Sequence, residues 1–278
     1  MQVNDAPVVR FTNVEELFDD INDTDQDLLI VINVSPKDFT KIQREREKRR
    51  RKFRFRRYNV DAQVLFITVT TGLHETLHAE LYQLFRKPIV LNDWCKSWVS
   101  LGATTFHYQG SPRAPIGEGD STGGPSPERR GRGKWPTLVI LSRVTATIDQ
   151  LRKDMQWWFP ASNHDVKIVL LAKFDHRQSC VLIERGEERI PHLQGPITRR
   201  RHAAILQQND ALEPVKRQTI TITRDETTDP VSYNVAGGPL VLEFRLLFLR
   251  DPSLEDRDVV INIEDLKDFG MWAWEMAS

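Results

Sequence analysis

Apolar residues recur along the chain in runs whose spacing alternates between that of strands and that of helices. Nearly continuous apolar runs at 62–70, 136–141 and 166–174 are typical of buried β-strands. Between the last two runs, residues 147–159 (TIDQLRKDMQWWF) have the mixed apolar and polar spacing of a helix. A strand, a crossover helix and a second strand favour a parallel pair in the middle of a sheet. The pattern therefore predicts an α/β fold with a mixed central sheet flanked by helices.

Weaker patterns on either side of this unit predict further elements. Helices are expected where apolar residues recur over several turns, and strands where β-branched residues dominate. The expected helices cover 14–21, 74–85 and 263–277, and the expected strands cover 28–34, 103–108, 180–185 and 218–225. We also expect a charged helix running into an arginine-rich strand over 37–57, a short strand or helix over 239–249, and irregular chain over 186–217.

Charge is strongly segregated near the start of the chain, although Lys plus Arg equals Asp plus Glu and the formal net charge is zero. Residues 1–30 are acidic, whereas residues 41–57 (KIQREREKRRRKFRFRR) carry eleven basic residues against two glutamates. We expect a charged extension over 1–57, acidic and then basic, followed by one α/β domain over 58–278. Within that domain, residues 109–134 are rich in Gly, Pro and Ser and are expected to form a mobile insert.

Cysteine usage and hydropathy favour an intracellular protein. Two cysteines, Cys95 and Cys180, are too few for a disulfide framework and are typical of a reducing compartment. No apolar run approaches the roughly 18 residues that a membrane span needs, and no secretory leader is apparent. We therefore expect a protein of the nucleus or cytoplasm that has no membrane partner.

His74, Glu75 and His78 form an HExxH pattern at the start of an expected helix. In zinc hydrolases, the two histidines of such a pattern lie on one helix face and bind the ion, while the glutamate acts on the bound water. A zinc site also needs a third ligand, and no later acid or histidine carries a recognisable third-ligand motif. Glu75 favours a helix N-terminus by its charge alone, and His78 is expected to be partly exposed. We therefore expect no stoichiometric zinc, with a zinc hydrolase as the distant alternative.

A longer series of motifs runs through the chain. In order, these are the HExxH helix, SWVSLGATTF, GEGDS, WPTLVI, a helix with DMQWWF, SNHDVKIVLLAKFD and GGPLVLEFRLLFLR. The series resembles a large group of uncharacterised fungal proteins whose core looks like the PD-(D/E)xK restriction-endonuclease-like fold. The resemblance covers residues 53–275. It implies a restriction-endonuclease-like fold for the central sheet and its helices.

The resemblance also implies positions for a catalytic site. Asp120 in GEGDS matches the first acid of the motif, Glu75 the acid often found on the first helix, and Asp154 an Asp that is common on the second helix. Leu141 stands where family members usually carry a Glu, and Arg143 stands where a Lys is usual. The expected remnant site thus comprises the three acids, with Asp120 as the candidate Mg²⁺ ligand.

The missing acid decides which chemistry we expect. Metal-assisted hydrolysis needs at least two carboxylates on the ion, because a single carboxylate binds Mg²⁺ weakly and leaves the water poorly activated. Leucine supplies no ligand, and an arginine stays protonated and cannot act as a base. We therefore expect a catalytically degenerate, nuclease-like binding or interaction protein without a cofactor. The alternative is an active Mg²⁺-dependent nuclease or phosphodiesterase whose second acid comes from elsewhere, such as Asp154 or Glu118.

Three interpretations of the basic run stay open. It contacts phosphate backbones, or it is a nuclear import signal of the KRRRK kind, or it is a solvated helix face. Phe53 and Phe55 alternate with Arg54 and Arg56, as in a strand with one apolar and one basic face. Nucleic acid is therefore the candidate partner, while no particular protein partner is indicated. The candidate contact residues are Arg49, Arg50, Arg51, Arg54, Arg56 and Arg143.

Overall fold

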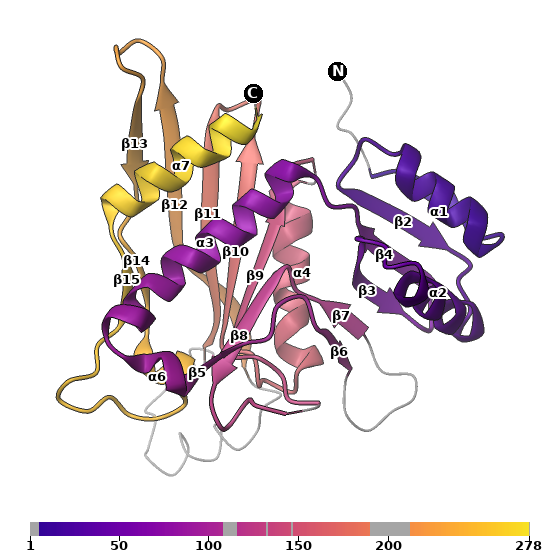
Figure 1. Ribbon diagram of the computed structural model, residues 1–278, viewed down its shortest axis with the longest axis horizontal. Coiled ribbons are helices and arrows are strands. Elements are labelled where there is room, and N and C mark those ends of the chain that lie inside the picture. Colours follow the sequence, from indigo (N-terminus) through magenta and orange to yellow (C-terminus); the bar gives the residue numbers. More distant parts are fainter. Residues whose placement is uncertain (1–5, 108–115, 132, 146, 190–211, 278) are drawn as a thin grey trace, which may run out of the picture.

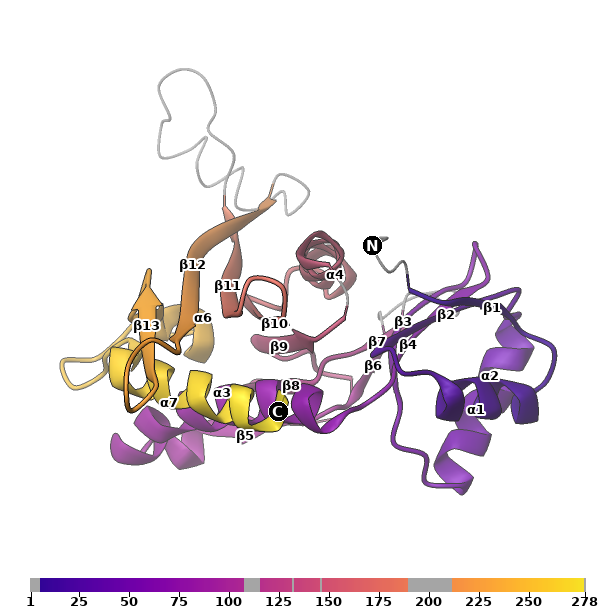
Figure 2. The ribbon, with the colours of Figure 1, turned by 90° about the horizontal axis from the view of Figure 1, so that it is seen from above.

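The computed structural model describes residues 6–107, 116–131, 133–145, 147–189 and 212–277. These residues form two units that lie side by side, as Figures 1 and 2 show. The N-terminal unit, at the right of Figure 1, contains the chain up to residue 70 and two strands from the segment 105–118. The core unit contains the remaining elements.

The core unit is built on a mixed sheet. Within the described residues it has seven strands in the order β13-β12-β11-β10-β9-β8-β5. Their bounds are β5 Trp98–Ser100, β8 Ser121–Pro125, β9 Leu138–Arg143, β10 Ile168–Asp175, β11 Cys180–Arg189, β12 Glu213–Asp225 and β13 Ser232–Ala236. β9 and β10 are parallel, with Leu141 opposite Leu171, whereas β10 and β11 are antiparallel. The predicted parallel pair and its antiparallel neighbour are confirmed.

Helices cover both faces of this sheet. Two of them, α3 (Gly72–Leu91) and α7 (Ile263–Ala277), lie on one face, and α4 (Ile148–Ala161) lies on the other (Figure 2). The side chains of alternate residues of β9 lie on opposite faces of the sheet, because successive strand side chains point to opposite sides. Ile140 belongs to the apolar core under α3 and α7, whereas Leu141 belongs to the core under α4. The predicted mixed sheet flanked by helices is therefore confirmed.

Two short helices and a small sheet complete the core unit. A 3-10 helix, η1 (Trp94–Ser97), leads from α3 towards β5. Two strands, β14 (Leu240–Leu242) and β15 (Val259–Ile261), pair with each other, and α6 (Phe244–Phe248) lies between them in the chain. Residues 239–249 therefore form a strand and then a helix. Among the helices described here, none is both long and apolar enough to cross a membrane.

The N-terminal unit has a sheet and an apolar core of its own. In the described part of the chain this sheet has six strands in the order β1-β2-β4-β3-β7-β6. Their bounds are β1 Val8–Arg10, β2 Leu28–Ile32, β3 Arg54–Asn59, β4 Val64–Thr68, β6 Thr105–His107 and β7 Ile116–Glu118. Two helices, α1 (Val14–Asp23) and α2 (Pro36–Lys48), lie against it (Figure 1). Their apolar side chains and those of the sheet form one core. Phe39 of α2, for example, stacks on Tyr58 of β3 at 4.3 Å between ring centroids.

The boundary expected at residue 57 from the charge pattern falls inside β3. Phe55 and Tyr58, on either side of it, are buried in the same apolar core. The N-terminal residues are thus a folded unit rather than a charged extension, because their apolar residues are sufficient for a small core. Strands β6 and β7, which come after α3 in the chain, complete its sheet.

Two segments expected to lack regular structure contain strands. The expected mobile insert over 109–134 includes β7 and β8, and residues 117–125 are buried. The strands β11 and β12 likewise extend into the segment 186–217. Residues 108–115, 132 and 190–211 lie outside the described residues. The glycine-rich residues of β8 form a strand because they pair with β9 and β5, not because of their own strand propensity.

Candidate functional site

Asp120 lies between β7 and β8, directly beside β9. Its backbone N–H donates to the carbonyl of Ile140 at 3.1 Å, and its carboxylate accepts the backbone N–H of Ser142 at 2.8 Å. These two bonds hold Asp120 against the part of β9 that carries Leu141. The Leu141 side chain is buried in the apolar core under α4. The structure therefore brings together the two positions that the resemblance pairs.

Cations surround the Asp120 carboxylate. Arg54 of β3 lies 3.3 Å from its Oδ1, and Arg143 of β9 lies 3.2 Å from its Oδ2. His74 of α3 approaches Oδ1 with its Nε2 at 3.4 Å. The side chains of Asp120 and Arg143 are each only 1% exposed, so water screens this ion pair little. Both carboxylate oxygens are thus occupied by groups from the chain itself.

Arg54 also contacts Glu75 and so joins the two acids. Nη2 of Arg54 lies 3.0 Å from Oε1 of Glu75, while Nη1 of the same guanidinium contacts Asp120. On its other side, Glu75 lies 3.1 Å from Nε2 of His78. The guanidinium therefore stands between the two carboxylates, where a metal ion shared by both acids would have to bind.

Two further acids considered for catalysis are also held by arginines. Asp154 of α4 forms an ion pair with Arg56 of β3. Glu118 of β7 accepts both terminal guanidinium nitrogens of Arg46, from α2, at 2.8 Å. Because Arg46, Arg54 and Arg56 all belong to the N-terminal unit, that unit supplies an arginine to each acid around the expected site. The pattern KIQREREKRRRKFRFRR does not indicate this, since Glu118 and Asp120 lie more than sixty positions beyond the arginines that contact them.

These contacts shift the pKa values of the site. Burial alone raises the pKa of Asp120, but the positive charges of His74 and Arg143 outweigh it and hold that pKa well below its ordinary value. Burial likewise raises the pKa of Glu75, and its contacts with His74 and His78 outweigh burial, so the net shift is downward. Burial lowers the pKa of His74, whereas Asp120 and Glu75 raise it, and the net shift is above its ordinary value of 6.5.

We expect the free energy of unfolding to be greatest between about pH 4.5 and 6.5. A carboxylate with a depressed folded pKa contributes stability above its unfolded value of about 4, and this stability is lost as the pH falls. His74 has a raised pKa, so its contribution is fully present below 6.5 and is lost as the pH rises through its folded pKa. Urea unfolding at pH values from about 3 to 8 measures the loss of stability at both the acidic and the basic end.

The variant Glu75→Gln tests whether Glu75 causes the loss of stability at low pH. It should flatten the loss of stability at low pH, because one carboxylate with a depressed pKa has been removed. The exposed Glu255, changed to glutamine in the same way, serves as a control that should leave the profile as it is. Superimposable profiles for the unaltered chain and Glu75→Gln would contradict the role given to these ion pairs.

The donor set around Asp120 does not fit Mg²⁺. This ion takes oxygen ligands at about 2.0–2.1 Å in octahedral geometry. Leu141 supplies no oxygen, and the oxygens of Asp120 already lie beside Arg54 and Arg143. A further cation among these guanidinium groups is opposed by like-charge repulsion in a poorly screened setting. No hydrolytic step through Mg²⁺ therefore follows from this arrangement.

Three of the six residues expected to contact nucleic acid are buried in ion pairs. The exposed fractions of the side chains are 14% for Arg54, 4% for Arg56 and 1% for Arg143. Arg56 and Arg143 are drawn inward by Asp154 and Asp120, beyond the reach of a phosphate backbone. Arg54 is paired with Asp120 and Glu75 but still lines a cavity that is described below. The alternation of Phe and Arg in β3 therefore does not produce a solvated basic face, because its arginine face is covered by the core unit.

The turn between α2 and β3 presents the exposed part of the basic run. Arg49 is paired with Glu15 of α1 at 2.7 Å. Arg50, Arg51 and Lys52 are exposed, and in the described ranges no carboxylate lies within ion-pair distance of them. Arg50 adopts the left-handed region at φ 50°, which turns the chain here. Lys52 was not among the expected contact residues, although it continues the same run.

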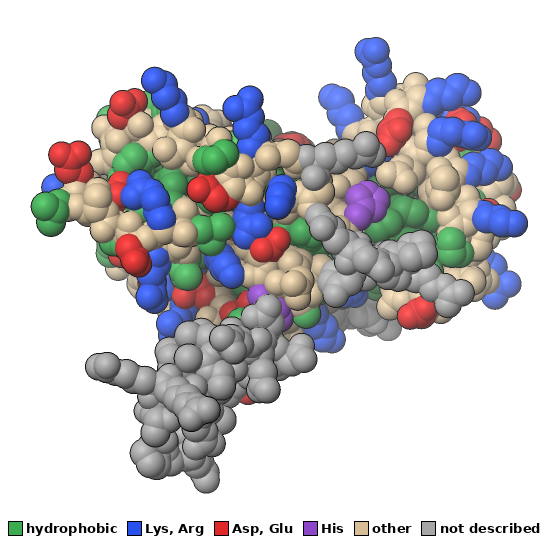
Figure 3. All heavy atoms as spheres, turned by 90° about the horizontal axis from the view of Figure 1, so that it is seen from below, with side chains coloured by type: hydrophobic (Ala, Val, Ile, Leu, Met, Phe, Trp, Pro, Cys, Tyr) green, Lys and Arg blue, Asp and Glu red, His purple; other side chains and the backbone are tan. Residues whose placement is uncertain are grey.

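Two cavities adjoin this turn. Their volumes are about 530 and 410 Å³, and both are lined by Arg50, Arg51, Lys52, Phe53 and Thr70, which we call the basic groove. Arg54 and Glu75 also line the larger cavity, so the basic groove opens onto the remnant site. Figure 3 shows Lys and Arg side chains gathered over the N-terminal unit, at the right of that view. The groove is the part of the basic run that a large anion can reach.

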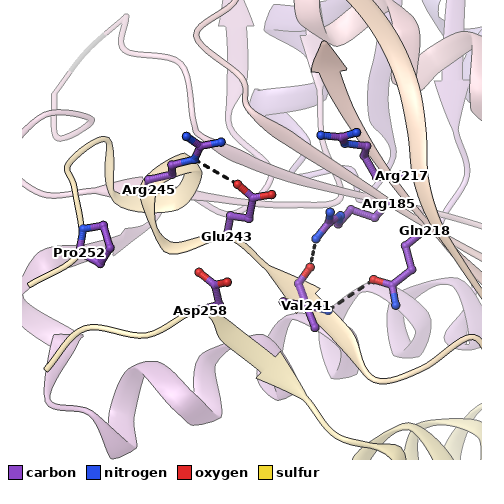
Figure 4. A pocket seen from close by; sticks show the side chains of 8 residues that line it. All are labelled: Arg185, Arg217, Gln218, Val241, Glu243, Arg245, Pro252 and Asp258. Carbon is purple, nitrogen blue, oxygen red and sulfur yellow. Dashed lines mark hydrogen bonds and ion pairs between the residues drawn. The ribbon is translucent and has the colours of Figure 1, made fainter. Parts of the chain in front are cut away.

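A third cavity, of about 540 Å³, lies within the core unit (Figure 4). The arginines that line it are engaged with acids or with the backbone. Arg245 lies 3.1 Å from Glu243, Arg217 lies 3.2 Å from the buried Glu187, and Arg185 donates to the carbonyl of Val241. None of the site residues expected from the sequence is among the described residues that line it.

The HExxH residues lie closer together than the sequence indicated. Nitrogens of His74 and His78 and a carboxylate oxygen of Glu75 all lie within 4.8 Å of one another. The expectation that no third ligand lies near the two histidines is therefore wrong, since Glu75 itself is in reach. The expectation of a partly exposed His78 is also wrong, because this residue is 5% exposed. The sequence search considered only later residues as third ligands, and so missed the one inside the motif.

Comparisons with known proteins found a structural likeness but no sequence relative. No protein-family model matches the chain. No curated protein matches it either. Among solved structures, the chain is similar to a nuclease candidate of the DUF820 family from Anabaena variabilis, with 9% identity, coverage of 77% of this chain and 90% of that chain, and a TM-score of 0.39. At this TM-score the likeness assigns no function, so function has to be argued from the residues of this chain.

Proposed function

We propose that the protein is a catalytically degenerate, nuclease-like binding protein that contacts the phosphate backbone of nucleic acid through the basic groove. One observation carries the proposal. Asp120 is held between Arg54 and Arg143, while Leu141 stands where a second acid is needed. An acid that is already neutralised by two guanidinium groups is a poor ligand for the ion on which hydrolysis depends.

An active nuclease with a displaced second acid receives less support. The two acids available for that role, Glu118 and Asp154, are held by Arg46 and Arg56. Recruiting either of them to a metal would leave a buried arginine unpaired, and breaking a buried ion pair in this way costs about 3–5 kcal/mol. The pairing of both of these acids therefore favours the degenerate site over the displaced one.

The basic groove supplies the means of binding. Arg50, Arg51 and Lys52 have no ion-pair partner within the part of the chain that the structure describes, so their charges are available to phosphate. Lys and Arg contacts to phosphate release condensed counterions, and this favours binding whatever the base sequence. Phe53 is buried and offers no exposed ring on which a base stacks. Backbone contact without sequence readout is thus the mode of binding that fits the groove.

Fluorescence anisotropy with labelled oligonucleotides tests this proposal. We expect weak binding of unrelated sequences with equal affinity. Three phosphate contacts predict that the logarithm of the association constant falls with the logarithm of salt concentration with a slope of about −2 to −3. Binding that salt does not weaken, or no binding at low salt, would reject the proposal and leave the basic run as an import signal or a solvated face.

A further inference from the structure

The two histidines of the HExxH pattern each present one nitrogen towards the Glu75 carboxylate. His74 and His78 lie one turn apart on α3, with their ring centroids 5.3 Å apart. Nδ1 of His74 lies 3.6 Å from Oε1 of Glu75, and Nε2 of His78 lies 3.1 Å from Oε2. A tetrahedral ion with bonds of about 2.0–2.2 Å separates its ligand atoms by roughly 3.3–3.6 Å. One ligand atom from each of the three residues lies within 4.8 Å of the other two, so the three groups can converge on one small cation.

In each histidine, the ring nitrogen that points away from Glu75 contacts another residue, and the nitrogen near Glu75 remains available to an ion. Nδ1 of His78 lies 2.9 Å from Oγ of Ser121, and Nε2 of His74 lies 3.4 Å from Oδ1 of Asp120. Arg143 lies 3.1 Å from the same Nε2 and shares Asp120 as its acceptor. Metal-binding histidines typically donate the proton of the outer nitrogen to an acceptor, which turns the other lone pair towards the ion. Ser121 and Asp120 can act as such acceptors, whereas Arg143 can only donate and is the ion-pair partner of Asp120.

His74 provides a second, independent sign of a missing ligand. The residue is fully buried, yet its Nδ1 has no hydrogen-bond partner among the described residues. A buried polar atom without a partner costs about 1–3 kcal/mol, so native structures usually satisfy such atoms. The unpartnered nitrogen lies 3.6 Å from the Glu75 carboxylate, within the cluster of His74, Glu75 and His78.

We propose that His74, Glu75 and His78 bind a transition-metal ion of the zinc class. Imidazole nitrogens suit Zn²⁺ and related ions, whereas Mg²⁺ and Ca²⁺ take oxygen ligands. The side chain of Glu75 is 44% exposed and lines the cavity of about 530 Å³, which gives the ion access from solvent. Three protein ligands leave a fourth position for water.

Arg54 is the group that competes with the ion. Its Nη2 lies 3.0 Å from Oε1 and 3.1 Å from Oε2 of Glu75. The ion needs one of these oxygens, and Arg54 keeps the other together with its contact to Asp120. Repulsion between the ion and the guanidinium lowers the affinity relative to a site without an arginine, because like charges this close oppose each other.

The proposed site differs from the site of a zinc hydrolase. In the hydrolase reading of the motif, the glutamate acts on a metal-bound water, whereas here Glu75 is a ligand. The inference concerns the binding of the ion and does not rest on contact with nucleic acid. Binding of the ion and binding of nucleic acid are therefore tested independently.

Zinc titration of the metal-free chain, in competition with a chromophoric chelator, tests the site. We expect one Zn²⁺ per chain and a rise in the melting temperature with added Zn²⁺, because a ligand that binds the folded state stabilises it. His78→Gln removes a ligand and should weaken binding by more than about 100-fold, since loss of an outer partner alone typically costs about 10- to 100-fold. Ser121→Ala removes such a partner of His78 and should fall within that smaller range.

Two controls separate this site from other donors. A Cys95→Ser background removes the exposed thiol, and His107→Gln changes an exposed histidine outside the cluster and should leave the stoichiometry at one. Circular dichroism checks that His78→Gln folds. If His78→Gln does not fold, the zinc affinity of Ser121→Ala is used as the test instead. Absence of zinc binding by the unaltered chain overturns the proposal. Binding that neither His78→Gln nor Ser121→Ala weakens overturns it as well.

Discussion

Replacing Asp120 by asparagine is expected to lower the free energy of unfolding by about 3–5 kcal/mol. The reason is the position of Asp120 in the fold rather than any catalytic role. Its carboxylate faces Arg143, and both side chains are 1% exposed. It also faces Arg54, whose side chain is 14% exposed. Removing the negative charge leaves these guanidinium groups buried without full compensation, which is more costly than the loss of a surface ion pair.

Urea unfolding of Asp120→Asn measures the effect, with the exposed Asp251→Asn as the matched control. The control should change stability by no more than about 0.5 kcal/mol. In the double variant Asp120→Asn with Arg143→Met, the two changes should add to less than the sum of the single ones, because the methionine removes a cation that the first change left unpaired. A loss below about 1 kcal/mol for Asp120→Asn would contradict the view that this acid neutralises buried arginines.

Replacing Arg50, Arg51 and Lys52 together by glutamine is expected to weaken nucleic-acid binding roughly 100-fold near 0.1 M salt. Each phosphate contact releases about 0.7–0.9 of a counterion. Three contacts therefore raise the association constant about 100-fold when the salt concentration falls from about 1 M to 0.1 M. The salt slope should become flatter by about 2 to 3 units for the same reason. Fold stability should change little, because these side chains have no ion-pair partner in the described residues and Arg51 makes only an exposed hydrogen bond to Asn22 and a contact with the Phe18 ring.

The matched control changes Lys153, Arg177 and Arg257 to glutamine, since these exposed cations lie outside the basic groove. It alters the net charge by the same amount and should leave most of the binding and the salt slope intact. An equal loss in both variants would show that net charge, rather than the basic groove, attracts the nucleic acid.

The centre of the fold could be predicted because its pattern is local. The run that becomes β9, the helix α4 and the run that becomes β10 follow one another in the chain, and each has an unambiguous period. A parallel pair with a crossover helix has one favoured arrangement, so the neighbours could be named as well. The terminal helix, α7, was predictable for the same reason.

The remainder of the fold depends on contacts between distant residues. Strands β7 and β8 form from the glycine-rich segment around GEGDS, whose propensity favours a loop. The basic run divides into buried arginines and an exposed turn according to which acids lie opposite, namely Glu118 of β7 and Asp120 and Asp154 of the core unit. Nothing in residues 41–57 indicates that division.

The candidate site was predicted in part. The resemblance supplied Glu75, Asp120 and the Leu141 position, and the structure brings them together through Arg54 and β9. Arg54 was expected to face solvent and phosphate, whereas it contacts both acids. This could not be deduced from the sequence, because it requires the N-terminal unit to dock on the core unit, and no local pattern encodes that contact.

The proposed loss of hydrolysis with retained binding is tested most directly on the unaltered chain. The chain is incubated with labelled single- and double-stranded DNA and RNA in the presence of Mg²⁺ or Mn²⁺. The same samples are read by anisotropy, to show that the oligonucleotide is bound, and by gel, to show whether it is cut. Our account predicts bound and intact oligonucleotide, with no difference between metal and EDTA. Cleavage that EDTA abolishes, and that is lost in Glu75→Gln or Asp120→Asn, would contradict it.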